Sequence, residues 1–70
     1  MTLKINSMYE VSGGYLVPRS HLRLEKGERF AIFQELETTA NGFISRHRTY
    51  STRELRKKFK LEKGEKIDIL

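Results

Sequence analysis

The sequence of 70 residues contains no cysteine, which excludes a disulfide framework and any metal site built on thiolates. It also has no apolar run near the roughly 20 residues that a membrane-spanning helix needs. The first residues lack the apolar core of a signal peptide. We therefore expect a soluble, cytoplasmic protein without membrane association. A chain this short forms at most one domain and buries only about 60% of its unfolded surface, so we expect it to gain stability from oligomerisation or from two mutually supporting halves.

Catalytic motifs are missing as well. The two histidines, His21 and His47, are far apart in the sequence, and no His-Glu-x-x-His pattern or carboxylate cluster accompanies them. There is no Gly-x-Ser-x-Gly nucleophile motif. The pair Gly13-Gly14 is not followed by the lysine and hydroxyl residue of a phosphate-binding loop. The sequence thus predicts a protein that is not an enzyme, with no catalytic residues, no metal site and no cofactor.

Positive charge is abundant. Fourteen lysines and arginines against nine acidic residues give a net charge of +5. Such a balance favours a polyanionic partner, with nucleic acid first and an acidic protein surface second. The plainer interpretation is a basic surface that only serves solubility.

Turn signals divide the chain into short extended segments. Residues 8–17 are typical of a hairpin turning at Gly13-Gly14, because glycine adopts positive φ at little cost. Residues 29–34 are apolar on both faces, which predicts a central strand. Asn41-Gly42 is the strongest short hairpin signal, so residues 43–50 are expected to return alongside it.

One helix is predicted from its N-terminal cap. Ser51 and Glu54 have the spacing of a capping box, in which each side chain accepts from the other residue's backbone amide. The helix should cover residues 52–60 and direct Leu55 and Phe59 towards the core. Residues 19–23 are too few for more than one helical turn, and residues 66–70 should form the final strand.

The pentapeptide LEKGE occurs twice, at residues 24–28 and 61–65. We interpret it as a turn that starts a strand after a helical or turn segment. Leu24 and Leu61 would cover the core, and Gly27 and Gly64 would take left-handed backbone conformations. The acidic residue after each glycine would accept from nearby turn amides.

The second copy, YSTRELRKKFKLEKGEKIDIL at residues 50–70, resembles the core motif of the AbrB/MazE/SpoVT swapped-hairpin proteins. Leu55-Arg56, the Gly64-Glu65 pair and the alternating isoleucines match the family pattern, whereas Thr52 stands where the family usually has proline. The first copy, GGYLVPRSHLRLEKGERFAIF, keeps that proline as Pro18 but has a shorter helical segment.

The resemblance implies a single domain, residues 1–70, with pseudo-repeats at about 8–34 and 43–70. Its fold class would be mainly β with one or two short helices (α+β), a small swapped-hairpin-like barrel. The barrel would be closed by an interleaved homodimer or by the two repeats. Residues 3–5, or a second subunit, are expected to cover the edge of the final strand.

The resemblance also implies a DNA-binding transcriptional regulator, because AbrB-like proteins contact duplex DNA with basic residues on their hairpins. Arg46 and Arg48 are the closest equivalents by position. Basic side chains neutralise phosphates, and arginine also reads guanine in the major groove. The candidate nucleic-acid-binding residues lie on the polar strand, on one arc of the helix and in the first copy: Arg46, His47, Arg48, Arg53, Arg56, Lys57, Lys60, Arg19 and Arg23.

Two alternatives stay open. One is a small phage or mobile-element protein that binds and inhibits or adapts a host protein, with residues 3–5 or 67–70 adding to a partner's sheet. The other is a small RNA-binding barrel. The phenylalanines are expected in the core rather than on a base-stacking platform, and the exposure of Tyr9 and Tyr15 is left open.

Overall fold

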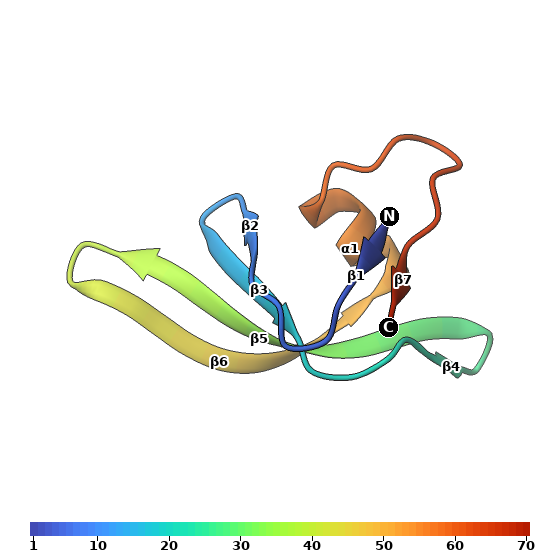
Figure 1. Ribbon diagram of the computed structural model, residues 1–70, viewed down its shortest axis with the longest axis horizontal. Coiled ribbons are helices and arrows are strands. Elements are labelled where there is room, and N and C mark those ends of the chain that lie inside the picture. The colour runs from blue at the N-terminus through green and yellow to red at the C-terminus, as the bar shows by residue number, and fades with distance from the viewer.

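The computed structural model describes residues 1–70, with the side chain of Glu25 outside the description. It is mainly β with one short helix, and Figure 1 shows the arrangement. The elements in chain order are β1 (Thr2–Leu3), β2 (Tyr9–Val11), β3 (Gly14–Pro18), β4 (Arg23–Glu25), β5 (Glu28–Thr39), β6 (Gly42–Ser51), α1 (Thr52–Lys58) and β7 (Asp68–Ile69).

Strand β5 is the centre of the larger, five-stranded sheet. Along one edge it pairs with β4 near its start and with β3 further on, and β2 continues the sheet beyond β3. Along its other edge it pairs with β6 over almost its whole length. The central position predicted for residues 29–34 is confirmed, although the strand is twelve residues long. The β5–β6 hairpin extends well beyond the rest of the molecule (Figure 1).

A small second sheet joins the two ends of the chain. Strands β1 and β7 run parallel, with Leu3 opposite Ile69. The amide of Leu70 donates to the carbonyl of Leu3 at 3.0 Å, and the amide of Ile5 donates to the carbonyl of Leu70 at 2.9 Å. The expectation that residues 3–5 cover the edge of the final strand is therefore confirmed. Because β1 and β7 pair with each other, these paired edges are not open to the sheet of a partner protein.

The core lies between one face of the large sheet, the helix and the small sheet. Its buried side chains come from every part of the chain: Leu3, Leu16, Ala31, Phe33, Tyr50, Leu55, Ile67 and Ile69. The two sheets do not close into a barrel within the described chain. The domain is thus an open, strongly curved sheet that buries one face.

Local turn and cap signals are confirmed. Residues 9–18 form the predicted hairpin, with Gly13 at φ 87°. Asn41-Gly42 closes the β5–β6 hairpin, in which Thr39 lies opposite Gly42. The side chain of Ser51 accepts from the amide of Glu54, and the carboxylate of Glu54 accepts from the amide of Ser51.

The two LEKGE copies adopt different structures, so the prediction of one shared unit is wrong. In the first copy, Lys26 and Gly27 form the turn of a β4–β5 hairpin, and a strand precedes that turn. In the second copy the turn follows α1 and leads through a segment without regular structure into β7. Leu24 is 73% exposed, which contradicts its predicted core role. Leu61 packs against the core as predicted.

Several boundaries and burial expectations also change. Residues 19–23 form no helix: Arg23 begins strand β4, which is held by pairing with β5. The final strand covers Asp68–Ile69 rather than residues 66–70, because β1 supplies only two partner residues. Among the phenylalanines, Phe33 is buried, whereas Phe43 is 61% exposed because the β5–β6 hairpin carries it away from the core. Tyr9 and Tyr15 are both half-buried.

Candidate nucleic-acid interface

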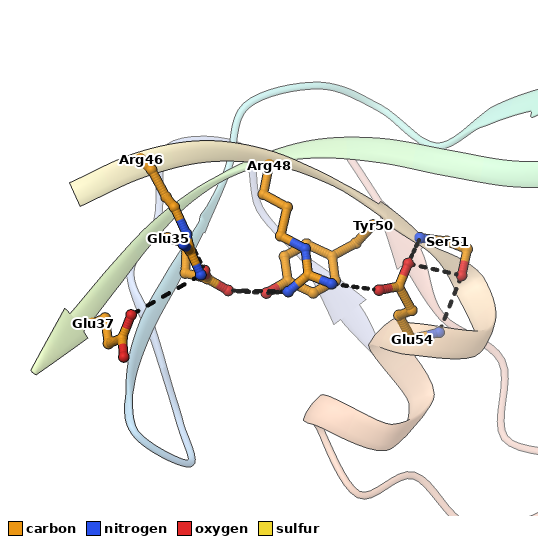
Figure 2. A network of polar contacts seen from close by, with 7 residues as sticks. All are labelled: Glu35, Glu37, Arg46, Arg48, Tyr50, Ser51 and Glu54. Carbon is orange, nitrogen blue, oxygen red and sulfur yellow. Dashed lines mark hydrogen bonds and ion pairs between the residues drawn. The ribbon is translucent and has the colours of Figure 1, made fainter. Parts of the chain in front are cut away.

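A network of charged side chains lies on the core-facing side of the β5–β6 hairpin (Figure 2). The register places Glu35 opposite Arg46, and alternation puts Arg48 and Tyr50 on the same face. The Nε of Arg46 donates to Glu35 at 2.9 Å, and its Nη2 lies 4.0 Å from a carboxylate oxygen of Glu37. These contacts fix the direction of the Arg46 side chain along the sheet.

Glu35 is the buried charged residue of this network, with 8% of its surface exposed. Its carboxylate accepts a hydrogen bond from the phenol of Tyr50, which is fully buried. Burial alone raises the pKa of Glu35, but the hydrogen bonds from Tyr50 and Arg46 and the positive charges of Arg46 and Arg48 outweigh it, so the pKa is lowered. The pKa of Tyr50 is raised to about 12 by its own burial and by its bond to Glu35. Glu35 therefore stays ionised and Tyr50 stays neutral at pH 7.

Arg48 connects the hairpin to the helix. Its Nη2 donates to Glu54 of the capping box at 2.7 Å, and its Nη1 donates to the hydroxyl of Tyr50 at 3.2 Å. The guanidinium also lies 4.4 Å from the centroid of the Tyr50 ring, a cation–π distance. Strand β6 runs directly into α1 at Ser51, so these contacts set the orientation of the helix on the sheet (Figure 2).

Arg46 and Arg48 were predicted as the residues closest to DNA, yet the structure pairs both with carboxylates of the same chain. Their positive charges are matched by Glu35, Glu37 and Glu54. The pairing of Arg46 with Glu35 could have been predicted from the sequence. A two-residue loop at residues 40–41 fixes the hairpin register and so places Glu35 directly opposite Arg46.

His47 lies on the opposite face of β6, opposite Gln34. On this outer face Arg19 donates to the side chains of Asn6 and Gln34. Arg23 is exposed on β4, which pairs with the first residues of β5. The residues predicted for the strand and for the first copy are therefore spread over both faces of the sheet instead of forming one surface.

The helix brings the remaining predicted residues together. Arg53, Lys57 and Lys60 are exposed. Arg53 and Lys57 are four residues apart and share one face of α1, and Lys60 follows two residues after the helix, which ends at Lys58 rather than at residue 60 as predicted. Arg56 instead donates to the backbone carbonyls of Glu62 and Glu65, so it holds the second LEKGE turn against the helix. Lys58, which is not among the predicted residues, is half-buried on the side of the helix that faces the sheet.

Almost the whole net charge of the protein resides in this segment. Residues 52–60 contain five basic side chains and one acidic side chain, a net charge of +4 compared with +5 for the chain. The single acidic side chain, Glu54, already accepts a hydrogen bond from the guanidinium of Arg48. An open cleft of about 270 Å³ lies beside the segment, lined by Ser12, Arg48, Tyr50, Glu54, Lys57, Lys58 and Lys60. We call Arg53, Lys57, Lys58 and Lys60 the helix cations.

The helix ends in an uncommon way. The amide of Leu61 donates to the carbonyl of Arg56 at 2.9 Å, and the amide of Lys60 donates to the carbonyl of Lys57 at 3.3 Å. These two hydrogen bonds together form a Schellman motif, in which the residue with the left-handed backbone conformation is usually glycine. Here that residue is Lys60, with φ 53°. A side chain at this backbone conformation costs about 1 kcal/mol relative to glycine, so the cation is present in spite of local strain.

The structure gives no support for a metal centre: no group of three or more potential ligands occurs among the described side chains. The Nδ1 of His21 lies 3.2 Å from the carbonyl oxygen of Ile69, so this histidine contacts the backbone of the last strand. No helix in the described chain is long and apolar enough to cross a membrane. In comparisons with known proteins, the chain matches no protein family, no curated protein and no solved structure.

Proposed function

We propose that this protein binds nucleic acid, duplex DNA in the first place, through the helix cations. The observation that carries the proposal is the net charge of +4 within residues 52–60. Among the described residues, none of the helix cations forms an ion pair with a carboxylate. Such uncompensated cations can each neutralise a backbone phosphate and release counterions.

Lys60 supplies one of these charges from a backbone conformation that favours glycine. Backbone strain of this kind persists where the surrounding structure enforces it, and it is common at binding sites. Glycine would relieve the strain and keep the Schellman motif. Lysine at this position supplies a charge next to the open cleft.

In this proposal Arg46 and Arg48 position the helix rather than contact DNA. The guanidinium of Arg48 lies 3.7 Å from the buried carboxylate of Glu35 and donates to Glu54 at the start of α1, so it connects the sheet to the helix. Of the residues predicted to contact nucleic acid, the proposal thus keeps Arg53, Lys57 and Lys60 and leaves out those of strand β6.

The finer form of the proposal is an AbrB-like transcriptional regulator that acts as a homodimer. It is supported by the family-like pattern at Leu55-Arg56, Gly64-Glu65 and the isoleucines of the last segment. A closed swapped-hairpin barrel would draw strands from a second chain, because the sheets of one chain stay open.

The test is a titration of duplex DNA with the wild-type protein and with Lys60→Gly, followed by fluorescence anisotropy at several salt concentrations. Lys60→Gly removes one positive charge and relieves the left-handed strain. We therefore expect weaker binding, a slope of log affinity against log salt that is smaller by about one, and no loss of thermal stability.

Lys26→Gly is the matched control. Lys26 is also an exposed lysine at positive φ, 50°, but it lies in the β4–β5 turn, outside the helix cations. Lys26→Gly should leave the affinity for DNA and the slope of log affinity against log salt unchanged. Equal losses in the two variants would refute the helix as the site, and absence of duplex binding at low salt would refute the function. Parallel titrations with single-stranded DNA and RNA identify the preferred nucleic acid.

A further inference from the structure

Strand β6 has one unpaired edge. Its ten residues pair with β5 on one side without interruption, from Ser51 opposite Phe30 to Gly42 opposite Thr39. No other strand in the described chain pairs with β6. A long unpaired strand exposes a row of backbone donors and acceptors that can extend the sheet.

The direction of these backbone groups follows from β5. The amide of Thr38 donates to Gly13 and the carbonyl of Ile32 accepts from Arg19, so the even-numbered residues of β5 face away from β6. In an antiparallel ladder the groups alternate between the two sides. The residues of β6 that direct their amides and carbonyls to the open edge are therefore Phe43, Ser45, His47 and Thr49.

The devices that usually protect such an edge are missing from β6. It contains no proline, no lysine and no bulge. The side chains of Arg46 and Arg48 are drawn back across the sheet face by Glu35 and Glu54 (Figure 2). Near the start of the strand, Phe43 is 61% exposed and Ile44 is 53% exposed. Because successive strand residues point to opposite faces, one exposed apolar side chain lies beside the open edge on each face of the sheet.

We propose that the edge of β6 binds a second copy of this chain, antiparallel to it, about a two-fold axis at Ser45. Outward-facing residues must meet outward-facing residues. An axis at Arg46 would set the two Arg46 side chains opposite each other, and an axis at His47 would set Arg46 opposite Arg48. Like charges directly opposite destabilise a sheet.

An axis at Ser45 avoids both conflicts. It places Arg46 opposite Ile44 and Arg48 opposite Gly42, and it sets the exposed ring of Phe43 beside His47. Seven residues of each β6 then pair, compared with five for an axis at Ile44, which leaves fewer ladder hydrogen bonds. The arginines need no acidic partner in the second copy, because carboxylates of their own chain already neutralise them. This favours a second copy over an acidic segment of another protein.

The absence of cysteine makes the register directly testable. In Ser45→Cys, the two thiols would face each other across the axis at a Cα separation of about 5.5 Å, which a disulfide can span. Oxidation joins them by loss of two electrons and two protons to an added oxidant, copper phenanthroline. We expect rapid formation of a covalent dimer. Thr49→Cys on the same strand is the matched control, since its two thiols would lie roughly 26 Å apart along the strands.

Sedimentation equilibrium without nucleic acid completes the test. The wild-type protein should show a monomer–dimer equilibrium. Ser45→Pro should be monomeric with an unchanged circular dichroism spectrum, because its amide faces the open edge and makes no bond within the monomer. Ser45→Ala loses only the exposed hydrogen bond from Gln34 and should still dimerise.

A wild-type protein that stays monomeric up to about millimolar concentration would overturn the proposal. A dimer that survives Ser45→Pro would also overturn it, as would crosslinking of Thr49→Cys that is as fast as crosslinking of Ser45→Cys. None of these outcomes depends on nucleic acid, so the inference is tested separately from DNA binding by the helix cations, although a protein that stays monomeric would also refute the homodimer of the AbrB-like form.

Discussion

Replacement of the buried carboxylate, Glu35→Gln, tests the most consequential contact in the structure. The change preserves shape and one acceptor oxygen but removes the negative charge. In the native protein, the carboxylate accepts from the phenol of Tyr50 and from Arg46. Glutamine keeps only one acceptor oxygen and no charge, so one of these two hydrogen bonds has to be lost and the other is no longer made to a charged group.

The expected magnitude follows from the burial of each partner. Hydrogen bonds to a charged group contribute about 1.5–3 kcal/mol net. The Arg46 side chain is more than half exposed, so water can replace its hydrogen bond and its ion pair with Glu35 adds little to stability. The fully buried phenol of Tyr50 has no such replacement. We expect Glu35→Gln to lower the free energy of unfolding by about 2 kcal/mol at pH 7, and Tm by about 8–16 °C.

The assay is urea denaturation followed by circular dichroism, combined with Tyr50→Phe in a double-mutant cycle. Because the two side chains share a buried bond, their effects should be non-additive by about 1 kcal/mol. The pKa of Glu35 is lowered below its usual 4.5. Its stabilisation is therefore complete above that value and is lost as pH falls through the lowered pKa.

The difference between wild type and Glu35→Gln should accordingly shrink below about pH 4.5. A loss under about 0.5 kcal/mol at pH 7 would mean that water satisfies these groups and that the network contributes no stability. A difference that remains unchanged at low pH would show that the charge of Glu35 is not its cause.

Two further predictions concern the same sheet. Because burial and the bond to Glu35 raise the pKa of Tyr50 to about 12, the folded state favours the neutral phenol. The free energy of unfolding should fall as pH rises from about 10 to 12, and this fall should be smaller in Tyr50→Phe, as measured by urea titrations. Gly14→Ala should destabilise the protein by about 3 kcal/mol in thermal unfolding, since its Cβ would overlap the carbonyl oxygen of Leu36. Gly13→Ala, where the Cβ meets open space, should lose only about 1–2 kcal/mol to its positive φ; equal losses would show that the close approach at Gly14 is unimportant.

Features encoded within a few neighbouring residues were predictable. The Asn41-Gly42 turn and the Ser51–Glu54 capping box depend on backbone conformations and hydrogen bonds that span at most four residues. The central position of β5 was also predicted from its run of apolar residues, although the sheet buries only one face of this strand and leaves Ile32 on the other face 41% exposed.

The candidate site was only partly predictable. The helix cations lie in one short helix or just past its end, so helical periodicity was enough to group Arg53 and Lys57, whereas the place of Lys60 depends on how the helix ends. The roles of Arg46 and Arg48 depend on carboxylates of another strand and of the helix cap, which a scan for basic residues does not see. Arg56 is held by carbonyls that come close only after the chain has turned back on itself.

The repeated LEKGE shows most clearly where local information ends. By itself the pentapeptide determined a turn with glycine at positive φ, and both copies have one, at φ 83° and 86°. Tertiary structure decided everything around that turn. The first copy lies in a hairpin because β5 offers its early residues as a pairing edge to β4, whereas the second follows a helix anchored by Leu55 and is held by Arg56. Identical residues differ in structure because strand pairing and core burial depend on partners that lie far away in the sequence.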